Sequence, residues 1–73
     1  MEPVTVTEAI RALHPEAAVR SVGQGYFEVT RPDEGITHVI GYGDSAEEAV
    51  YSAYRFEGKL RPRLDDGQGR LFS

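Results

Sequence analysis

The stretch 41–56 constrains the fold more than any other part of the chain. Its two glycines bracket a tyrosine and are followed by Asp44 and Ser45, after which alanines recur. Asp44 with Glu47, or Ser45 with Glu48, has the spacing of a capping box, in which two side chains satisfy backbone N–H groups at a helix start. The stretch therefore predicts the end of a strand, a tight turn and a helix capped by Asp44 or Ser45.

This predicted helix carries one apolar stripe, and most of the stripe is alanine. The stripe residues recur at helical spacing: Ala46, Ala49, Val50, Ala53 and Tyr54. Small side chains let such a helix lie close against a sheet, and Gly58 supplies its C-terminal cap. Tyr51 falls off the stripe, so we expect its side chain to be exposed.

An earlier helix is predicted at residues 6–13. Thr5 and Glu8 have the spacing of a second capping box. One apolar helix face follows: Val6, Ala9, Ile10 and Leu13. Pro15 ends the helix, because proline disfavours helical geometry in the residue before it.

Three strands are predicted between the helices. Residues 17–22 and 26–31 flank the turn 23–25, and residues 36–42 follow a turn at 32–35 that contains proline and glycine. Strand 26–31 alternates apolar and polar side chains, and strand 36–42 is rich in β-branched residues. The order α-β-β-β-α predicts an α+β fold, with a three-stranded antiparallel sheet and two helices on one face.

Residues 1–58 are expected to form one compact domain and residues 59–73 a flexible C-terminal tail. The helix pattern fails after Gly58, where charged residues, glycine and proline follow. A chain of this length buries only about 60% of the surface that its unfolded form exposes. Its core is therefore thin, and a homodimer would add burial.

The composition excludes several classes of partner. Twelve acidic against eight basic residues give a formal net charge of −4, and nucleic acid binds clustered Lys and Arg, so nucleic acid is not an expected partner. The absence of cysteine suits a reducing compartment. No apolar run is long enough to span a membrane, and residues 1–3 do not resemble a signal peptide, so we expect a cytoplasmic protein.

Over residues 3–57 the order of elements resembles the double-stranded-RNA-binding domain. Val6-x-Glu8 looks like the hydrophobic-x-Glu pattern of that family's first helix. The Gly-x-Gly-x-Ser run from Gly41, with alanines after it, looks like the family's strand-to-helix junction. The resemblance implies the same α-β-β-β-α fold.

The residues with which that family contacts RNA are largely missing. Ala46, Glu47 and Val50 stand where the family carries phosphate-binding lysines, and the short turn 23–25 replaces its Gly-Pro-x-His loop. Only Glu8 remains as a matched contact, and its capping role also explains it. We therefore expect the fold without nucleic-acid-binding residues.

A second resemblance is to HicB-type antitoxin domains and small phage-encoded proteins. In the antitoxins a Gly-Asp-Thr-x-Glu-Glu-Ala turn opens a helix, and residues 43–49 read Gly-Asp-Ser-Ala-Glu-Glu-Ala. The predicted helix 6–13 stands outside that family's usual order, and no DNA-binding segment follows. The resemblance implies an inhibitor-like module with an acidic surface.

No residue pattern predicts catalysis, a metal site or a cofactor. His14 and His38 have neither cysteines nor a paired acidic cluster with them and are expected to be structural. Glu47 and Glu48 are neighbours on a helix and do not face each other, so they do not form a catalytic carboxylate pair. The glycines before the second helix lack the third glycine and the lysine of nucleotide-binding loops. We expect a protein that is not an enzyme and has no small-molecule ligand.

The predicted tail carries the sharpest functional pattern. Gln68, Leu71 and Phe72 have the Gln-x-x-Leu-Phe spacing of bacterial sliding-clamp-binding peptides. That resemblance implies that the Leu-Phe pair enters an apolar pocket while the Gln amide fixes the register. The alternative is that Leu71 and Phe72 fold back on the domain or serve a dimer.

These patterns together predict a protein-binding adaptor or inhibitor of the phage type, which docks on a replication or repair partner such as the sliding clamp. The expected partner-binding residues are Gln68, Leu71, Phe72, Tyr51, Glu47 and Glu48. Four tyrosines in so short a chain suit either a protein interface or the border of a small core, where their hydroxyl groups contact solvent. Two alternatives stay open: an acidic surface that adds Asp33 and Glu34 to the two glutamates and inhibits a nucleic-acid-handling protein, or a degenerate double-stranded-RNA-binding domain.

Overall fold

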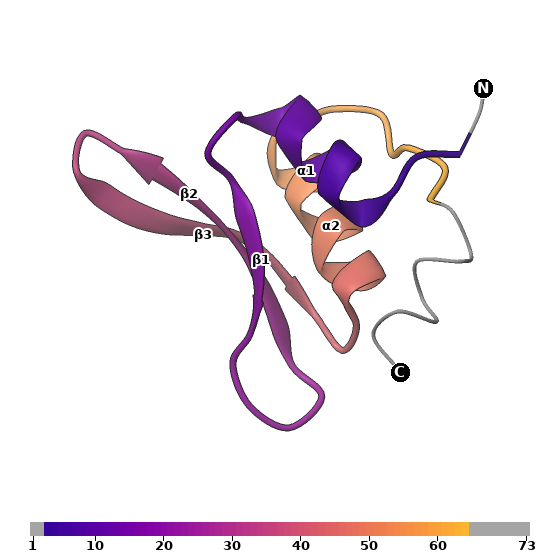
Figure 1. Cartoon of the computed structure of the whole chain (residues 1–73), viewed down its shortest axis with the longest axis horizontal. Helices are drawn as coiled ribbons and strands as arrows, with labels where there is room; N and C mark the ends of the chain where they lie inside the picture. Colours follow the sequence, from indigo (N-terminus) through magenta and orange to yellow (C-terminus); the bar gives the residue numbers. More distant parts are fainter. Residues whose placement is uncertain (1–2, 65–73) are drawn as a thin grey trace.

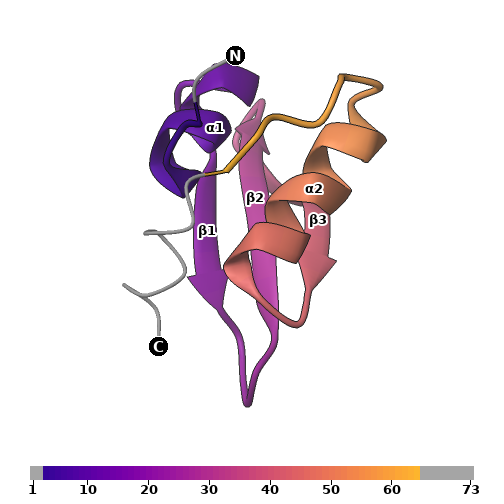
Figure 2. The ribbon, with the colours of Figure 1, turned by 90° about the vertical axis from the view of Figure 1, so that its right-hand side faces the viewer.

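Two helices pack on one face of a three-stranded antiparallel sheet (Figures 1 and 2). The structure is a computed structural model that describes residues 3–64. In chain order the elements are α1 (Val6–Leu13), β1 (Ala18–Ser21), β2 (Phe27–Asp33), β3 (Ile36–Gly43) and α2 (Ala46–Phe56). The predicted α+β class and the α-β-β-β-α order are confirmed.

The strands form a meander in the order β1-β2-β3, and the β2–β3 hairpin extends beyond the helices (Figure 1). Its turn is shorter than the predicted turn 32–35. Pro32 pairs with Thr37 and belongs to β2, so only Glu34 and Gly35 form the turn. Both turn residues have positive φ, as a tight two-residue hairpin turn of type I′ requires.

A β-bulge in the β2–β3 ladder turns two neighbouring residues of β3 toward the core. Val29 pairs with Gly41 and Thr30 with Val39, which leaves Ile40 without a partner in the ladder. The extra residue shifts the alternation, and Ile40 and Gly41 are both buried although they are neighbours.

The alanine stripe of α2 lies directly on β3, as the small side chains predict. Ala49 and Ala53 are fully buried, and a Cβ atom placed on Gly41 would lie 2.5 Å from the Ala49 carbonyl oxygen. Glycine is required here because the helix backbone takes up the space of a side chain.

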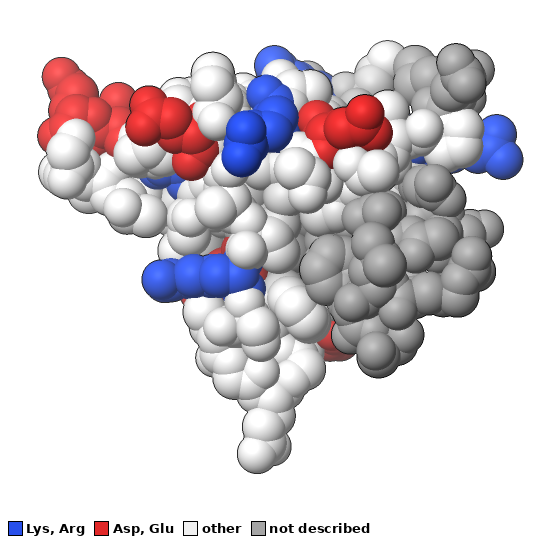
Figure 3. Space-filling model, in the orientation of Figure 1, with Lys and Arg blue, Asp and Glu red and all other residues white. Residues whose placement is uncertain are grey.

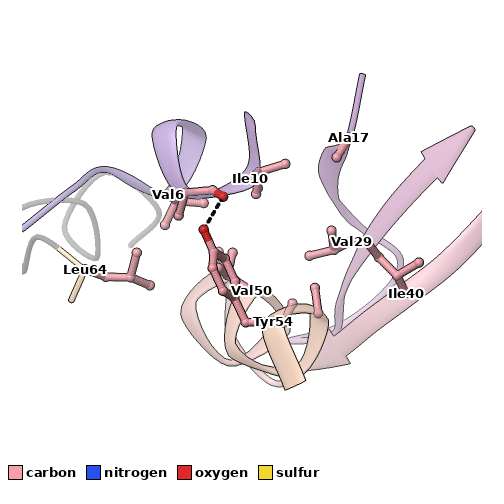
Figure 4. Close-up of a cluster of buried hydrophobic side chains, with 12 residues drawn as sticks. Val6, Ile10, Ala17, Val29, Ile40, Val50, Tyr54 and Leu64 are labelled. Carbon is pink, nitrogen blue, oxygen red and sulfur yellow. Dashed lines mark hydrogen bonds between the residues drawn. The ribbon is translucent and has the colours of Figure 1, made fainter. Parts of the chain in front are cut away.

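The core lies between the helices and the sheet, and α1 joins it through its predicted apolar face (Figure 4). Val29 and Val50 are its largest fully buried side chains among the described residues. The buried Tyr54 hydroxyl donates a hydrogen bond of 2.7 Å to the carbonyl oxygen of Ala9, which ties α2 to α1. Tyr54 therefore fills the core and has a partner for its polar end.

A partly buried ion pair ties β2 to the end of α2. A terminal nitrogen of Arg31 lies 3.0 Å from a Glu57 carboxylate oxygen. That oxygen and the Arg31 Nε are buried, and neither has a hydrogen-bond partner with good geometry among the described residues. The two charges are paired, but two of their polar atoms lack a hydrogen bond. We therefore expect the pair to contribute little to the stability of the fold.

The segment after α2 runs back across the helices toward α1 (Figure 2). Gly58 has a φ of 72°, and the Gly58 and Lys59 N–H groups bond to Arg55 and Tyr54, which is the Schellman pattern at a helix end. Leu64 is buried in the core and forms a parallel bridge with Val4. The compact part of the chain thus includes Leu64, beyond the predicted boundary at Gly58; residues 65–73 of the predicted tail lie outside the described residues.

Candidate functional site

Strand β3 forms one edge of the sheet and carries no Asp, Glu, Lys or Arg. It is eight residues long, and three of its large side chains are exposed: Ile36 at 62%, Val39 at 46% and Tyr42 at 59%. The other edge, β1, has four residues and carries Arg20. Edge strands are usually short or protected by charge or proline, because their unpaired backbone groups can pair with another chain. Among the described residues, nothing of this kind protects β3 except its bulge.

A groove of about 370 Å³ runs between β3 and α2. Its lining combines backbone and side chains of the strand with one side of the helix: Val39, Ile40, Gly41, Tyr42, Ser52, Arg55 and Phe56. Phe56 is 67% exposed although it belongs to the helix that forms the core. An apolar groove beside an open strand edge is suited to an extended peptide with apolar side chains.

Two tyrosines, Tyr26 and Tyr42, form an aromatic pair at the sheet. The rings of Tyr26 and Tyr42 have centroids 6.0 Å apart, and Tyr42 stands opposite Glu28 in the ladder. Glu28 in turn forms an ion pair of 3.2 Å with Arg20. Partial burial raises the pKa of Tyr26, and the negative charges of Glu28 and Asp44 and the neighbouring Tyr42 raise it further. This cluster therefore combines aromatic rings with charged side chains.

A second hollow, of about 590 Å³, lies on the outer side of α2. Its lining is mostly polar: Tyr42, Glu48, Tyr51, Ser52, Arg55 and Arg61. The Arg61 guanidinium carbon lies 4.7 Å from the centroid of the Tyr51 ring, which is cation–π distance. Tyr51 itself is half-buried and packs against the core, so the expectation of an exposed side chain is wrong. The sequence gives no sign of this contact, because Arg61 follows the end of the helix.

The four acidic residues of the predicted inhibitory surface do not lie together. Asp33 and Glu34 precede β3, whereas Glu47 and Glu48 follow it, and a strand of eight residues spans about 26 Å. Figure 3 shows acidic side chains gathered over the end of the β2–β3 hairpin. The two acidic pairs therefore form separate patches at opposite ends of the strand.

Glu48 has a structural role at the start of α2. Its N–H donates to the Ser45 hydroxyl at 3.1 Å, and its carboxylate accepts from the Asp44 N–H at 3.4 Å. Ser45 is thus the cap rather than Asp44. The Glu48 carboxylate bonds one residue before the cap, so the box is incomplete in α2, whereas Thr5 and Glu8 form both bonds of the box in α1.

The two histidines lie apart and make no common site. His14 follows α1, and its Nδ1 accepts a hydrogen bond of 3.1 Å from the Glu16 N–H. His14 thus bonds to the backbone of the turn that follows the helix. His38 lies exposed on β3. Within residues 3–64, no three His, Asp or Glu side chains are placed to hold a metal ion.

The remaining predicted partner-binding residues, Gln68, Leu71 and Phe72, lie outside the described residues.

A third groove, of about 400 Å³, lies between α1 and β1 and is mostly apolar. Its floor includes Val6, Ile10 and Phe27.

Comparison with known protein families, with curated proteins and with solved structures gave no match for this chain. Neither of the described helices is long and apolar enough to cross a membrane.

Proposed function

We propose that this chain is a non-enzymatic protein-binding module that receives an extended segment of its partner along β3. The observation that carries the proposal is the eight-residue edge strand without charged residues, beside a groove whose wall includes the exposed Phe56. Open backbone N–H and C=O groups on such an edge supply affinity in strand addition, and side-chain pockets supply specificity. The exposed Ile36, Val39 and Tyr42 give an incoming strand apolar contacts.

The test places a charge at the edge and at a matched position elsewhere. The partner is first captured with the tagged chain of residues 1–73, identified by mass spectrometry and purified. Val39→Lys is then expected to weaken binding at least tenfold in calorimetry, because an edge lysine opposes strand addition. The control is Ala18→Lys, which adds the same charge to the exposed end of β1. Equal affinity of the two variants would contradict the proposal, provided that both keep the native circular dichroism spectrum.

A second candidate is the adaptor role of the tail, with Gln68, Leu71 and Phe72 docking on a sliding clamp. It is supported by the Gln-x-x-Leu-Phe spacing of these residues. The buried Leu64, which bridges to Val4, is the last described residue before them. Deletion of residues 65–73 is expected to abolish binding to a purified bacterial sliding clamp, whereas Val39→Lys leaves it intact. The reverse pattern would favour the β3 edge, and a dimer that Val39→Lys dissociates would identify a second copy as the occupant.

Two further hypotheses are an acidic inhibitor and a double-stranded-RNA-binding domain. An acidic inhibitor would use either the hairpin pair or the helix pair of acidic residues, since these lie at opposite ends of β3. Its binding would weaken steeply as salt increases. Double-stranded-RNA binding would show as a gel shift at low salt.

A further inference from the structure

The hollow on the outer side of α2 brings two arginines together with hydroxyl groups. Arg55 comes from the helix, Arg61 from the segment that follows it, and the hydroxyl-bearing Tyr42 and Ser52 line the same hollow. These residues belong to β3, to α2 and to the segment after α2, and the tertiary structure brings them together.

Arg61 lies over the ring of Tyr51. Its guanidinium lies over the ring at 4.7 Å, and the ring is itself half-buried against the core. A guanidinium that rests one face on an aromatic ring keeps the N–H groups of its edge available to a ligand. These groups match the two oxygens of a carboxylate or phosphate.

Arg55 adds a second positive charge from the same side of the helix. Tyr51 and Arg55 are four residues apart, which places them next to each other on the surface of α2. The ion pairs found among the described residues are Arg20–Glu28 and Arg31–Glu57, and neither of them includes Arg55 or Arg61.

We propose that this hollow binds an oxyanion, a carboxylate or a phosphate group, through Arg55 and the stacked Arg61. Glu48 lines the opposite end of the hollow, about two helical turns from Arg55, and its carboxylate points to the Asp44 N–H. Its negative charge opposes anion binding. Removing this charge should therefore strengthen binding, whereas removing either arginine should weaken it. The hollow shares Tyr42, Ser52 and Arg55 with the β3 groove, but anion binding does not depend on strand addition.

The experiment is a ¹H–¹⁵N NMR titration of the full chain at constant ionic strength, with inorganic phosphate in one arm and glutarate in the other. Saturable shifts are expected at the amides of Tyr51, Ser52, Arg55 and Arg61. Tighter binding of phosphate would indicate a phosphorylated ligand, and tighter or equal binding of glutarate a carboxylate ligand. Shifts that rise without saturation and spread over arginines outside the hollow would overturn the proposal.

Variants separate a built site from general attraction of anions. Arg61→Ala and Arg55→Gln are each expected to weaken binding about fivefold or more, and Arg61→Lys nearly as much as Arg61→Ala, because an ammonium lacks the planar fork. Glu48→Gln is expected to strengthen binding about twofold. Arg11→Gln is the control, since it removes an exposed charge on α1 outside the hollow. If Arg11→Gln weakens binding as much as Arg61→Ala, the site does not exist. Free anions are the probes, so this outcome is independent of any partner at β3.

Discussion

At the scale of single residues, the missing side chain of Gly41 sets the distance between α2 and the sheet. A Cβ atom there would lie 2.5 Å from both the Ala49 carbonyl oxygen and the Ala53 nitrogen, and 2.8 Å from the Ala53 Cα. These are backbone atoms of a packed helix, so no side-chain rotation relieves the contact.

Gly41→Ala is therefore expected to destabilise the fold by about 1–3 kcal/mol, the usual cost of overpacking, as measured by urea unfolding. Gly25→Asn serves as the control. Gly25 has a φ of 64° with open space around it among the described residues, and Asn tolerates that conformation. Equal stability of the two variants would show that α2 moves away from β3 at little cost.

The Tyr54 hydroxyl makes the free energy of unfolding depend on pH in the alkaline range. Burial raises the pKa of Tyr54 above its ordinary value of about 10. The folded state thus holds the proton more tightly than the unfolded state. The resulting stabilisation is complete below the unfolded pKa and is lost as the pH rises through the folded pKa.

Tyr54→Phe removes both this pH dependence and the hydrogen bond to Ala9. We expect the variant to be less stable by about 1 kcal/mol at neutral pH, because the buried hydrogen bond between the two helices is lost. The difference from the native chain should narrow as the pH passes about 10. Urea midpoints measured across the alkaline range check this, and parallel curves for the two proteins would contradict it.

At the scale of elements, the helices follow local sequence signals closely. The capping box of Thr5 and Glu8 starts α1, and α1 covers the predicted residues 6–13.

The turn of the β2–β3 hairpin contains a residue type that does not favour its backbone conformation. Glu34 has a φ of 51°, an uncommon conformation for a residue with a long side chain.

Glu34→Asn is expected to stabilise the chain by about 0.5 kcal/mol, since Asn-Gly is the favoured pair in two-residue turns with positive φ. Glu34→Val removes the same charge but introduces a β-branched side chain that disfavours this φ, so it should destabilise by about 1 kcal/mol. Thermal and urea unfolding compare the two. The prediction fails if the Asn and Val variants are equally stable, because the effect would then come from the charge alone.

At the scale of the whole molecule, the segment after α2 closes the thin core. Leu60 is 94% exposed and Leu64 only 6%, although both lie in this segment. The Val4 N–H bonds to the Arg63 carbonyl at 2.9 Å, so the segment is fixed beside the residues that precede α1.

Leu64→Ala is expected to cost about 2 kcal/mol, at the lower end for a buried leucine because the site lies at the border of the core. Leu60→Ala, the same substitution at an exposed site, should stay within about 0.5 kcal/mol of the native chain. Urea unfolding of both variants measures the difference. If the two were equal, Leu64 would not contribute to the core.

The sequence by itself determined both helices, their caps and the order of the strands, because these depend on neighbours within a few residues. Ser45 with Glu48 and Thr5 with Glu8 are such local pairs, and so is the alanine stripe that predicts close packing on a sheet.

Only the tertiary structure decided the features that join distant residues. It extended β2 through Pro32, inserted the bulge at Ile40, and brought Leu64 into the core. It also separated the acidic pairs and stacked Arg61 on Tyr51. Strand register and burial after a helix end depend on contacts between residues far apart in sequence, and no local periodicity encodes those contacts.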